Sequence, residues 1–173
     1  MVGLRRGFGF LALAATIGAG VFLLWDDAGA SRLLGGTRVT VIDGDSLRAG
    51  DENIRLVGID APELFQTCRD ANGGEWQCGR AAKARLAALL SQGAVACAPR
   101  GRDRYGRTLA VCAAGEVADI GEALVREGHA VSFDGFSSGY AAAEREAREG
   151  RRGLWRGDFE RPQDWRRRHP RAG

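Results

Sequence analysis

The chain has 173 residues, of which 45% are hydrophobic and 27% are charged. This length supports one domain with a hydrophobic core and argues against a second domain of similar size. The formal net charge of +3 suits a polyanionic partner, but an excess this small is also common in soluble proteins and does not identify the partner by itself.

The N-terminal segment has the pattern of an export signal. Arg5 and Arg6 precede a stretch without charged side chains, residues 7–25. Its length is close to the roughly 20 apolar residues that span a bilayer, which favours an uncleaved membrane anchor. Residues 28–30 (Ala-Gly-Ala) match an Ala-x-Ala cleavage site, so a cleaved signal peptide stays open. With either outcome, the rest of the protein is expected outside the cytoplasm, as a periplasmic or secreted protein.

Three short strands are expected after a linker of residues 28–36. They cover residues 37–42, 46–48 and 54–59, which carry β-branched or apolar side chains and are separated by turn sequences. Strands that follow one another through such tight turns form an antiparallel meander.

The second half of the chain combines helices with a hairpin. Residues 80–90 place apolar side chains at helical spacing, and residues 94–98 and 108–113 predict two strands around a polar turn. Asp119 and Ser138 can each cap a further helix. This order predicts an α+β fold, and more specifically a five-stranded barrel with three packed helices.

The four cysteines fit a compartment outside the cytoplasm. Cys97 and Cys112 flank the turn of the predicted hairpin, so the two strands would place them opposite one another, within reach of a disulfide. Cys68 and Cys78 would then close the remaining loop. Four buried thiols are the alternative, but the export segment favours two disulfides.

Acidic side chains gather where two of the predicted strands end. Asp43 and Asp45 follow the first strand, and Asp60 and Glu63 follow the third. Carboxylate oxygens are the ligands that a hard divalent ion such as calcium takes. Each pair alone is more typical of a turn or a strand end. The hypothesis of a metal site therefore depends on the two pairs lying together.

Two arginines add a second chemical signal. Arg55 lies inside an apolar strand, where a charge is costly unless it is paired or functional. Arg107 ends the polar turn of the hairpin. Guanidinium groups bind phosphate oxygens in bidentate fashion, which suits a reaction that builds negative charge on phosphorus. A structural ion pair for Arg55 and a solvated turn for Arg107 are the alternatives.

Three blocks of the sequence resemble, in order, the signature blocks of the staphylococcal nuclease (thermonuclease) family. They are residues 41–46 (Val-Ile-Asp-Gly-Asp-Ser), 54–63 (Ile-Arg-Leu-Val-Gly-Ile-Asp-Ala-Pro-Glu) and 103–107 (Asp-Arg-Tyr-Gly-Arg). Residues 122–128 and 152–155 resemble its later helical blocks. The likeness assigns residues 37–156 to a nuclease domain, between a signal peptide or anchor at residues 1–27 and a basic C-terminal tail at residues 157–173.

The resemblance implies an OB-fold barrel and a calcium-dependent endonuclease. Such an enzyme cuts DNA and RNA, single-stranded or flexible, with little sequence preference, and it leaves 3′-phosphate ends. The calcium site would be built by Asp45, Asp60 and the main-chain carbonyl of Ala61, with Asp43 nearby. A monomer is expected, attached to the membrane if the N-terminal segment is uncleaved.

The resemblance also implies roles for the catalytic and substrate-binding residues. Glu63 would orient or deprotonate the attacking water, while Arg55 and Arg107 would hold the phosphate and stabilise its transition state. Arg104 and Tyr105 match substrate-pocket positions. Further pocket tyrosines of the family have no match here, and Phe133 lies in that region instead.

Two other functions compete with the nuclease hypothesis. An OB fold can bind nucleic acid without cutting it, and a third possibility is a scaffold or protein-binding module outside the cytoplasm. A binding module would be expected to have lost part of the acidic cluster, whereas this cluster is complete. A scaffold leaves a charged residue inside an apolar strand unexplained.

Overall fold

The structure is a computed structural model that describes residues 32–33, 37–133 and 139–170. The predicted export segment and the predicted helix cap at Ser138 lie outside the described residues. Within the described ranges, no helix is long and apolar enough to cross a membrane.

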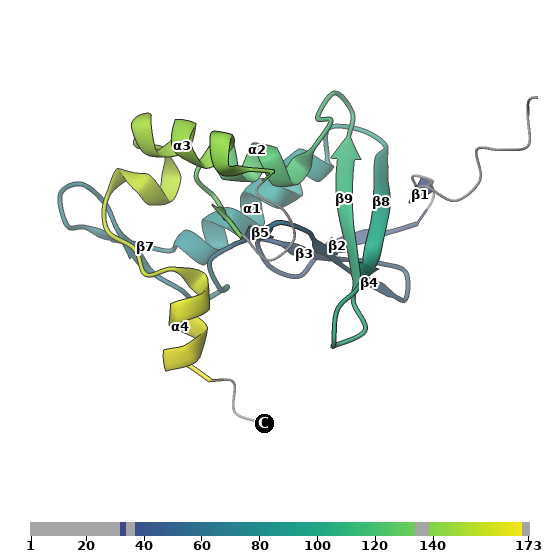
Figure 1. Ribbon diagram of the computed structural model, residues 1–173, viewed down its shortest axis with the longest axis horizontal. Helices are drawn as coiled ribbons and strands as arrows, with labels where there is room; N and C mark the ends of the chain where they lie inside the picture. The colour runs from purple at the N-terminus through teal and green to yellow at the C-terminus, as the bar shows by residue number, and fades with distance from the viewer. Residues whose placement is uncertain (1–31, 34–36, 134–138, 171–173) are drawn as a thin grey trace, which may run out of the picture.

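A six-stranded sheet forms the centre of the fold (Figure 1), with strand order β1-β8-β9-β4-β3-β2. These strands are β1 (Arg32–Leu33), β2 (Val39–Val41), β3 (Ser46–Ala49), β4 (Glu52–Leu56), β8 (Val95–Arg102) and β9 (Thr108–Ala114). β4 and β9 run parallel, and the other neighbours are antiparallel. The parallel pair brings the two halves of the chain together beside β4.

The α+β prediction is confirmed, but the predicted five-stranded barrel is not found among the described strands. The sheet has six strands and an open order that begins at β1 and ends at β2. The third predicted strand is also divided, because Gly58 adopts a φ of 78° in a turn. As a result β5 (Ile59–Asp60) leaves the sheet and pairs with β10 (Val131–Ser132). Asp60 therefore lies in a separate strand from Arg55.

Helices pack over the sheet and beyond its edge (Figure 1). They are α1 (Cys78–Leu90), α2 (Ile120–Arg126), α3 (Ala141–Glu149), the 3-10 helix η1 (Gly153–Arg156) and α4 (Pro162–Arg168). The predicted cap of α2 is confirmed, because Asp119 accepts a hydrogen bond from the Glu122 N–H at 3.0 Å. α4 was not predicted, and it lies in the segment expected to be a basic tail.

The hydrophobic core lies between the sheet and the first two helices. Leu47 and Leu56 from the sheet, Leu86 from α1 and Leu124 from α2 are almost fully buried in it. Burial of large aliphatic side chains contributes about 1.5–3 kcal/mol each to folding. The core therefore fixes β4, which carries Arg55, and β3, which directly follows Asp43 and Asp45.

Both predicted disulfides are present. Cys97 and Cys112 are direct partners in the register of β8 and β9. Cys68 and Cys78 join the short hairpin of β6 (Cys68–Arg69) and β7 (Glu75–Trp76) to the start of α1. Each bridge stabilises the fold by about 2–4 kcal/mol, chiefly by restricting the unfolded chain.

Candidate functional site

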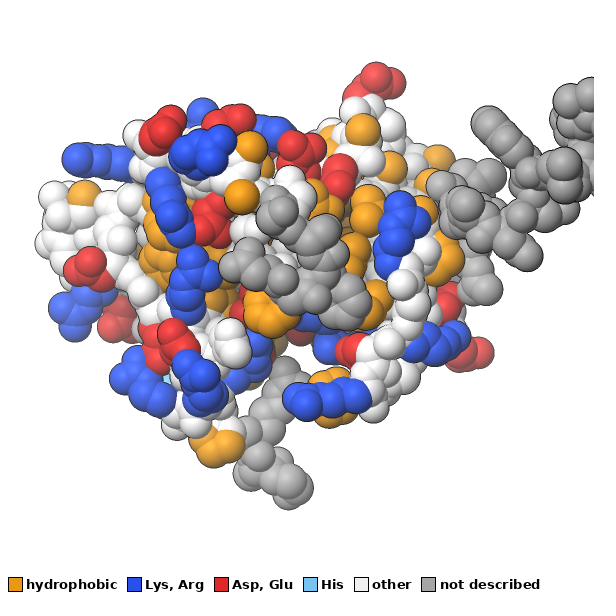
Figure 2. Space-filling view, in the orientation of Figure 1, with side chains coloured by type: hydrophobic (Ala, Val, Ile, Leu, Met, Phe, Trp, Pro, Cys, Tyr) orange, Lys and Arg blue, Asp and Glu red, His pale blue; other side chains and the backbone are white. Residues whose placement is uncertain are grey.

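The residues predicted to act together lie along one cleft of about 970 Å³. α4 and the β8–β9 turn project from the same side of the molecule (Figure 1), and Figure 2 shows an indentation between them. The predicted residues that line the cleft are Asp43, Asp45, Arg55, Ala61, Glu63, Arg104, Tyr105, Arg107 and Phe133. Asp60 lies beneath the surface, with 1% of its area exposed.

Strand pairing places the first acidic residues beside Arg55. Ser46 is the direct partner of Arg55 in the β3–β4 register, and the Asp45 carbonyl accepts a hydrogen bond from the Leu56 N–H at 2.9 Å. The glycine between the two aspartates is needed for packing, since a Cβ at Gly44 would lie 2.7 Å from the Cβ of Ala61. The Asp-Gly-Asp sequence thus lets the acidic turn pack closely against its neighbours.

Arg55 links two buried carboxylates. One terminal nitrogen donates to Asp45, and the other donates to Asp60 Oδ1 at 3.1 Å and to the Ile59 carbonyl at 3.3 Å. The side chains of Arg55, Asp45 and Asp60 are 18%, 5% and 1% exposed. The ion pair considered for Arg55 is therefore present, and it balances charge inside the protein.

The remaining contacts of Asp45 hold it in the charged form. Asp45 accepts hydrogen bonds from the Ser46 hydroxyl at 2.8 Å and from the Ala61 N–H at 3.1 Å. Burial alone would raise the pKa of Asp45, but the Arg55 charge and these hydrogen bonds lower it below its usual value. Burial likewise opposes the charge on Arg55, and its two carboxylate partners nevertheless raise its pKa.

Asp43 carries the opposite shift. Burial and the neighbouring charge of Asp45 raise the pKa of Asp43 to about 6, although the Asp45 N–H donates to it at 3.1 Å. Burial and the charge of Asp45 therefore both oppose ionisation of Asp43. A cation beside the two carboxylates would relieve their repulsion.

The last helix brings a second arginine to the acidic residues. Arg166 donates to both oxygens of Asp60, at 2.9 and 3.0 Å, and to Glu63 Oε1 at 3.1 Å. Sequence reasoning missed this residue because it treated the basic tail as irregular. Pro162 at the first helical position and the spacing of Trp165 and His169, four residues apart, were signals for a helix.

Aromatic rings lie along both ends of the same cleft. On α4, Trp165 and His169 stack with ring centroids 4.3 Å apart, and both line the cleft. In the β8–β9 turn, the Tyr105 ring is 70% exposed, with the guanidinium of Arg104 4.9 Å from its centroid. Exposed rings beside guanidinium groups suit stacking with nucleic acid bases.

Arg107 is positioned by its own turn. Asp103 accepts hydrogen bonds from the Arg107 N–H at 3.0 Å and from its Nε at 2.7 Å. The parallel pairing of β9 with β4 then sets this turn next to the strand of Arg55, with Thr108 opposite Ile54. The two predicted phosphate-binding arginines thus line one cleft, held by different acidic residues.

The acidic residues match calcium in chemistry but not in arrangement. Their oxygens are the hard ligands that calcium prefers. Among the described residues, however, no group of three or more His, Cys, Asp or Glu is placed to hold an ion. Both oxygens of Asp60 accept hydrogen bonds from Arg166, and both oxygens of Asp45 accept from protein donors. Arginines therefore take the place of a metal ion in this arrangement.

Comparison with known proteins identifies relatives of the chain. The family model described as staphylococcal nuclease homologue matches residues 53–157. The succinoglycan biosynthesis protein ExoI of Rhizobium meliloti (strain 1021) is 37% identical over 149 residues, 84% of this chain and 78% of that protein. An uncharacterized endonuclease of Escherichia coli is 32% identical over 126 residues, 69% of this chain and 76% of that protein. The protein of Oryza sativa subsp. japonica named "Probable staphylococcal-like nuclease CAN2" is 31% identical over 135 residues, 76% of this chain and 34% of that protein.

Proposed function

The chain belongs to the staphylococcal nuclease family, and on that premise we propose that it is a calcium-dependent endonuclease. It hydrolyses phosphodiester bonds of DNA and RNA with little sequence preference and leaves 3′-phosphate ends. The observation that carries this proposal is the single cleft that holds Arg55, Glu63 and Arg107 beside the buried acidic residues. The names of two relatives, an endonuclease and a staphylococcal-like nuclease, support the same class of reaction.

The residues of the cleft suit an attack of water on phosphorus. Glu63 accepts a proton from the attacking water, whose oxygen bonds to phosphorus as the bond to the 5′ oxygen breaks. The leaving oxygen takes up a proton from solvent water and becomes a 5′-hydroxyl, while the phosphate stays on the 3′ side. Arg55 and Arg107 offer guanidinium groups to the phosphate oxygens, where negative charge builds in the transition state.

Calcium dependence is proposed from the donor chemistry of Asp43, Asp45, Asp60 and the Ala61 carbonyl. These residues supply only oxygen ligands, which suit a hard ion such as calcium. Asp60 would contribute to such a site in competition with the arginine side chains that it already contacts.

We also propose that the protein works as a monomer outside the cytoplasm, attached to the membrane if residues 7–25 are uncleaved. Two disulfides support this location, because disulfides persist in oxidising compartments such as the periplasm. Fractionation of expressing cells, with immunoblotting of each fraction, tests the location and the size of the mature chain.

The function is tested by incubating the full-length protein with labelled single-stranded DNA and RNA, with calcium or with a chelator. The nuclease proposal expects fragments with 3′-phosphate ends in calcium and intact substrate in the chelator. Succinoglycan should stay intact, which separates this activity from the succinoglycan biosynthesis in the name of one relative. Binding of the oligonucleotides without cleavage under either condition would instead identify a non-catalytic nucleic-acid-binding module.

A further inference from the structure

Arg166 connects the last helix of the chain to the two acidic residues on which the proposed chemistry depends. Its guanidinium spans both oxygens of Asp60, at 2.9 and 3.0 Å, and one terminal nitrogen also reaches Glu63 at 3.1 Å. Paired hydrogen bonds between a guanidinium and a carboxylate are among the strongest polar contacts in proteins. Asp60 has only 1% of its side chain exposed, so little solvent competes for its oxygens.

A divalent ion and Arg166 would compete for the same carboxylate, that of Asp60. Arg55 already donates to Asp60 Oδ1 at 3.1 Å, so Asp60 is surrounded by two guanidinium groups. A cation bound to Asp60 in addition would face the charge of Arg166 at close range and would find both carboxylate oxygens already hydrogen-bonded. Ion binding and the Arg166–Asp60 contact therefore oppose one another.

We propose that Arg166 is a built-in cation of the acidic site, which a divalent ion must displace from Asp60, so that metal binding and release of α4 are coupled. This inference rests on the calcium site of the proposed function. α4 lies outside the part of the chain that matches the family, residues 53–157.

Of the two arginines on Asp60, Arg166 is the one that can leave. Its side chain is 37% exposed, against 18% for Arg55, which is fixed within β4 of the central sheet. Arg166 stands in a helix of seven residues near the end of the chain. An exposed terminal side chain regains solvation and rotamer freedom when it is released, whereas moving Arg55 would disturb the sheet.

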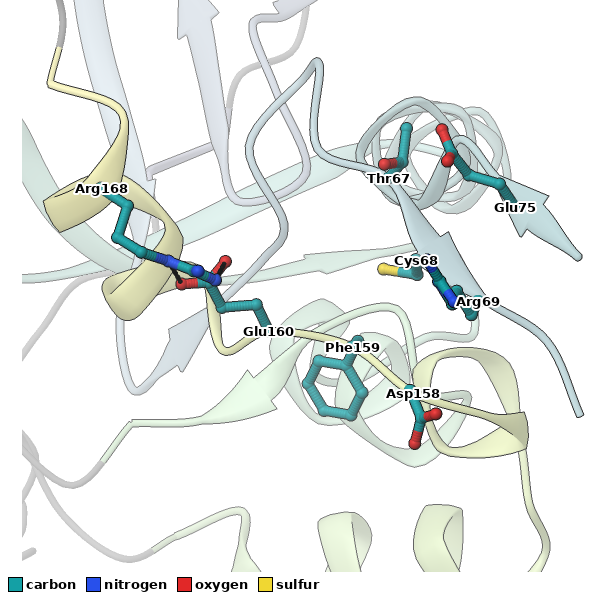
Figure 3. Close-up of a pocket in the computed structure, with 8 residues that line it drawn as sticks. All are labelled: Thr67, Cys68, Arg69, Glu75, Asp158, Phe159, Glu160 and Arg168. Carbon is teal, nitrogen blue, oxygen red and sulfur yellow. Dashed lines mark hydrogen bonds and ion pairs between the residues drawn. The ribbon is translucent and has the colours of Figure 1, made fainter. Parts of the chain in front are cut away.

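Other contacts of α4 lie away from the acidic residues. Arg168 pairs with Glu160, and Figure 3 shows these two side chains facing one another at the rim of a second cavity of about 510 Å³. The Glu160 carbonyl in turn accepts a hydrogen bond from Gln66 Nε2 at 2.7 Å. The segment before α4 is thereby held by contacts that a metal ion would not touch, which makes Arg168 a matched control.

Coupling of this kind has a simple quantitative form. The apparent dissociation constant for calcium equals the intrinsic constant divided by the fraction of molecules in which Arg166 is off Asp60. By linkage, docking of α4 weakens calcium binding by a certain coupling free energy. Calcium binding must weaken the docking of α4 by the same amount. The two consequences can be measured independently.

The first measurement is calorimetric titration of the full-length protein with calcium chloride, without nucleic acid. Arg166→Ala should bind calcium on the order of tenfold more tightly than the unaltered protein, because the competing bidentate contact is removed. Arg166→Lys should fall between the two, since lysine keeps the charge but not the paired geometry. Arg168→Ala removes the same charge from the same helix and should leave the affinity unchanged.

The second measurement is hydrogen exchange of the peptide that contains α4. In the unaltered protein, calcium should speed exchange in residues 162–168. In Arg166→Ala, exchange there should already be fast without calcium and should respond little to it. The Arg168→Ala variant should still respond to calcium.

Calcium affinity in Arg166→Ala that equals or falls below that of the unaltered protein would overturn the proposal, as would absence of calcium binding in both. An equal gain in Arg168→Ala would also overturn it, because general charge would then explain the effect. Neither measurement depends on cleavage. A protein that binds calcium as described but cuts no nucleic acid would refute the proposed function and leave the competition intact.

Discussion

Asp60 receives two arginines from very different parts of the molecule. Arg55 comes from β4 in the middle of the sheet, where it also bonds Asp45 and the Ile59 carbonyl. Arg166 comes from the last helix, and its side chain is about twice as exposed. Both contacts join a guanidinium group to the Asp60 carboxylate. The contact of Arg55 is part of the folded sheet, whereas the contact of Arg166 is accessible to solvent and can be exchanged. The surroundings, rather than the contact itself, decide which role an arginine has.

The largest effect is expected at Glu63, which shares Arg166 with Asp60. Glu63→Gln keeps the shape and an oxygen acceptor but loses the proton-accepting charge, so cleavage of single-stranded DNA should slow by about 10²–10⁴-fold. The thermal unfolding midpoint should barely change. Glu75→Gln, at an exposed position of β7, is the control. Near-normal cleavage by Glu63→Gln would remove Glu63 from the reaction.

The next largest effect is a difference in unfolding free energy between variants of the two arginines. Arg55→Ala leaves Asp45 and Asp60 buried without their shared partner, which should cost about 3–5 kcal/mol of unfolding free energy. Arg166→Ala should cost about 1 kcal/mol, because its side chain is partly exposed and Arg55 remains. Urea unfolding in a chelator measures both. Equal losses would mean that Arg166 is as structural as Arg55, and the contrast between them would disappear.

A pH series sharpens the account of the acidic turn. The pKa of Asp43 is raised from 3.8 to about 6, so the folded protein is penalised when Asp43 is ionised. The neutral form of Asp43 makes its full contribution to the free energy of unfolding below pH 4. This contribution is lost as the pH rises through 6. Asp43→Asn should therefore gain about 3 kcal/mol above pH 6 and nothing below pH 4, in urea unfolding with a chelator.

The prediction for Asp43 depends on the charge of its side chain. A gain that is the same at pH 4 and pH 7 would show that the aspartate charge is not the cause. Asp51→Asn, at an exposed turn position, is the control for the loss of an acidic side chain.

The smallest expected effect concerns the aromatic side of α4. Trp165→Ala, combined with Glu63→Gln to prevent cleavage, should weaken binding of a single-stranded oligonucleotide roughly fivefold, or about 1 kcal/mol. Fluorescence anisotropy of a labelled oligonucleotide measures it. Trp165→Phe should keep most of the affinity because a ring remains. Equal affinity for all three proteins would show that bases do not stack on this helix.

Local sequence patterns predicted much of the fold and the components of the site. The acidic turn and Arg55 were found because adjacent strands joined by tight turns must lie side by side. The pairing of Cys97 with Cys112 followed from the hairpin for the same reason, and the structure confirms it. The α+β class was also correct. In each case the interacting residues are close in sequence or belong to neighbouring strands.

Predictions failed where distant contacts compete with local ones. The strand predicted over residues 54–59 is broken at Gly58, because β5 pairs with β10 from the other half of the chain. The open six-stranded order depends likewise on the parallel pairing of β4 with β9. Periodicity carries no information about either partner.

The amino-acid sequence established which chemical groups this protein has and which of them are neighbours along the chain. It contained the carboxylates, the arginines and the resemblance to a nuclease family. The contact of Arg166 with both oxygens of Asp60 joins residues that are 106 positions apart, and it became visible only in the folded domain. A contact at this separation depends on the packing of the whole domain, whereas a turn or a strand pair is set by the residues that form it.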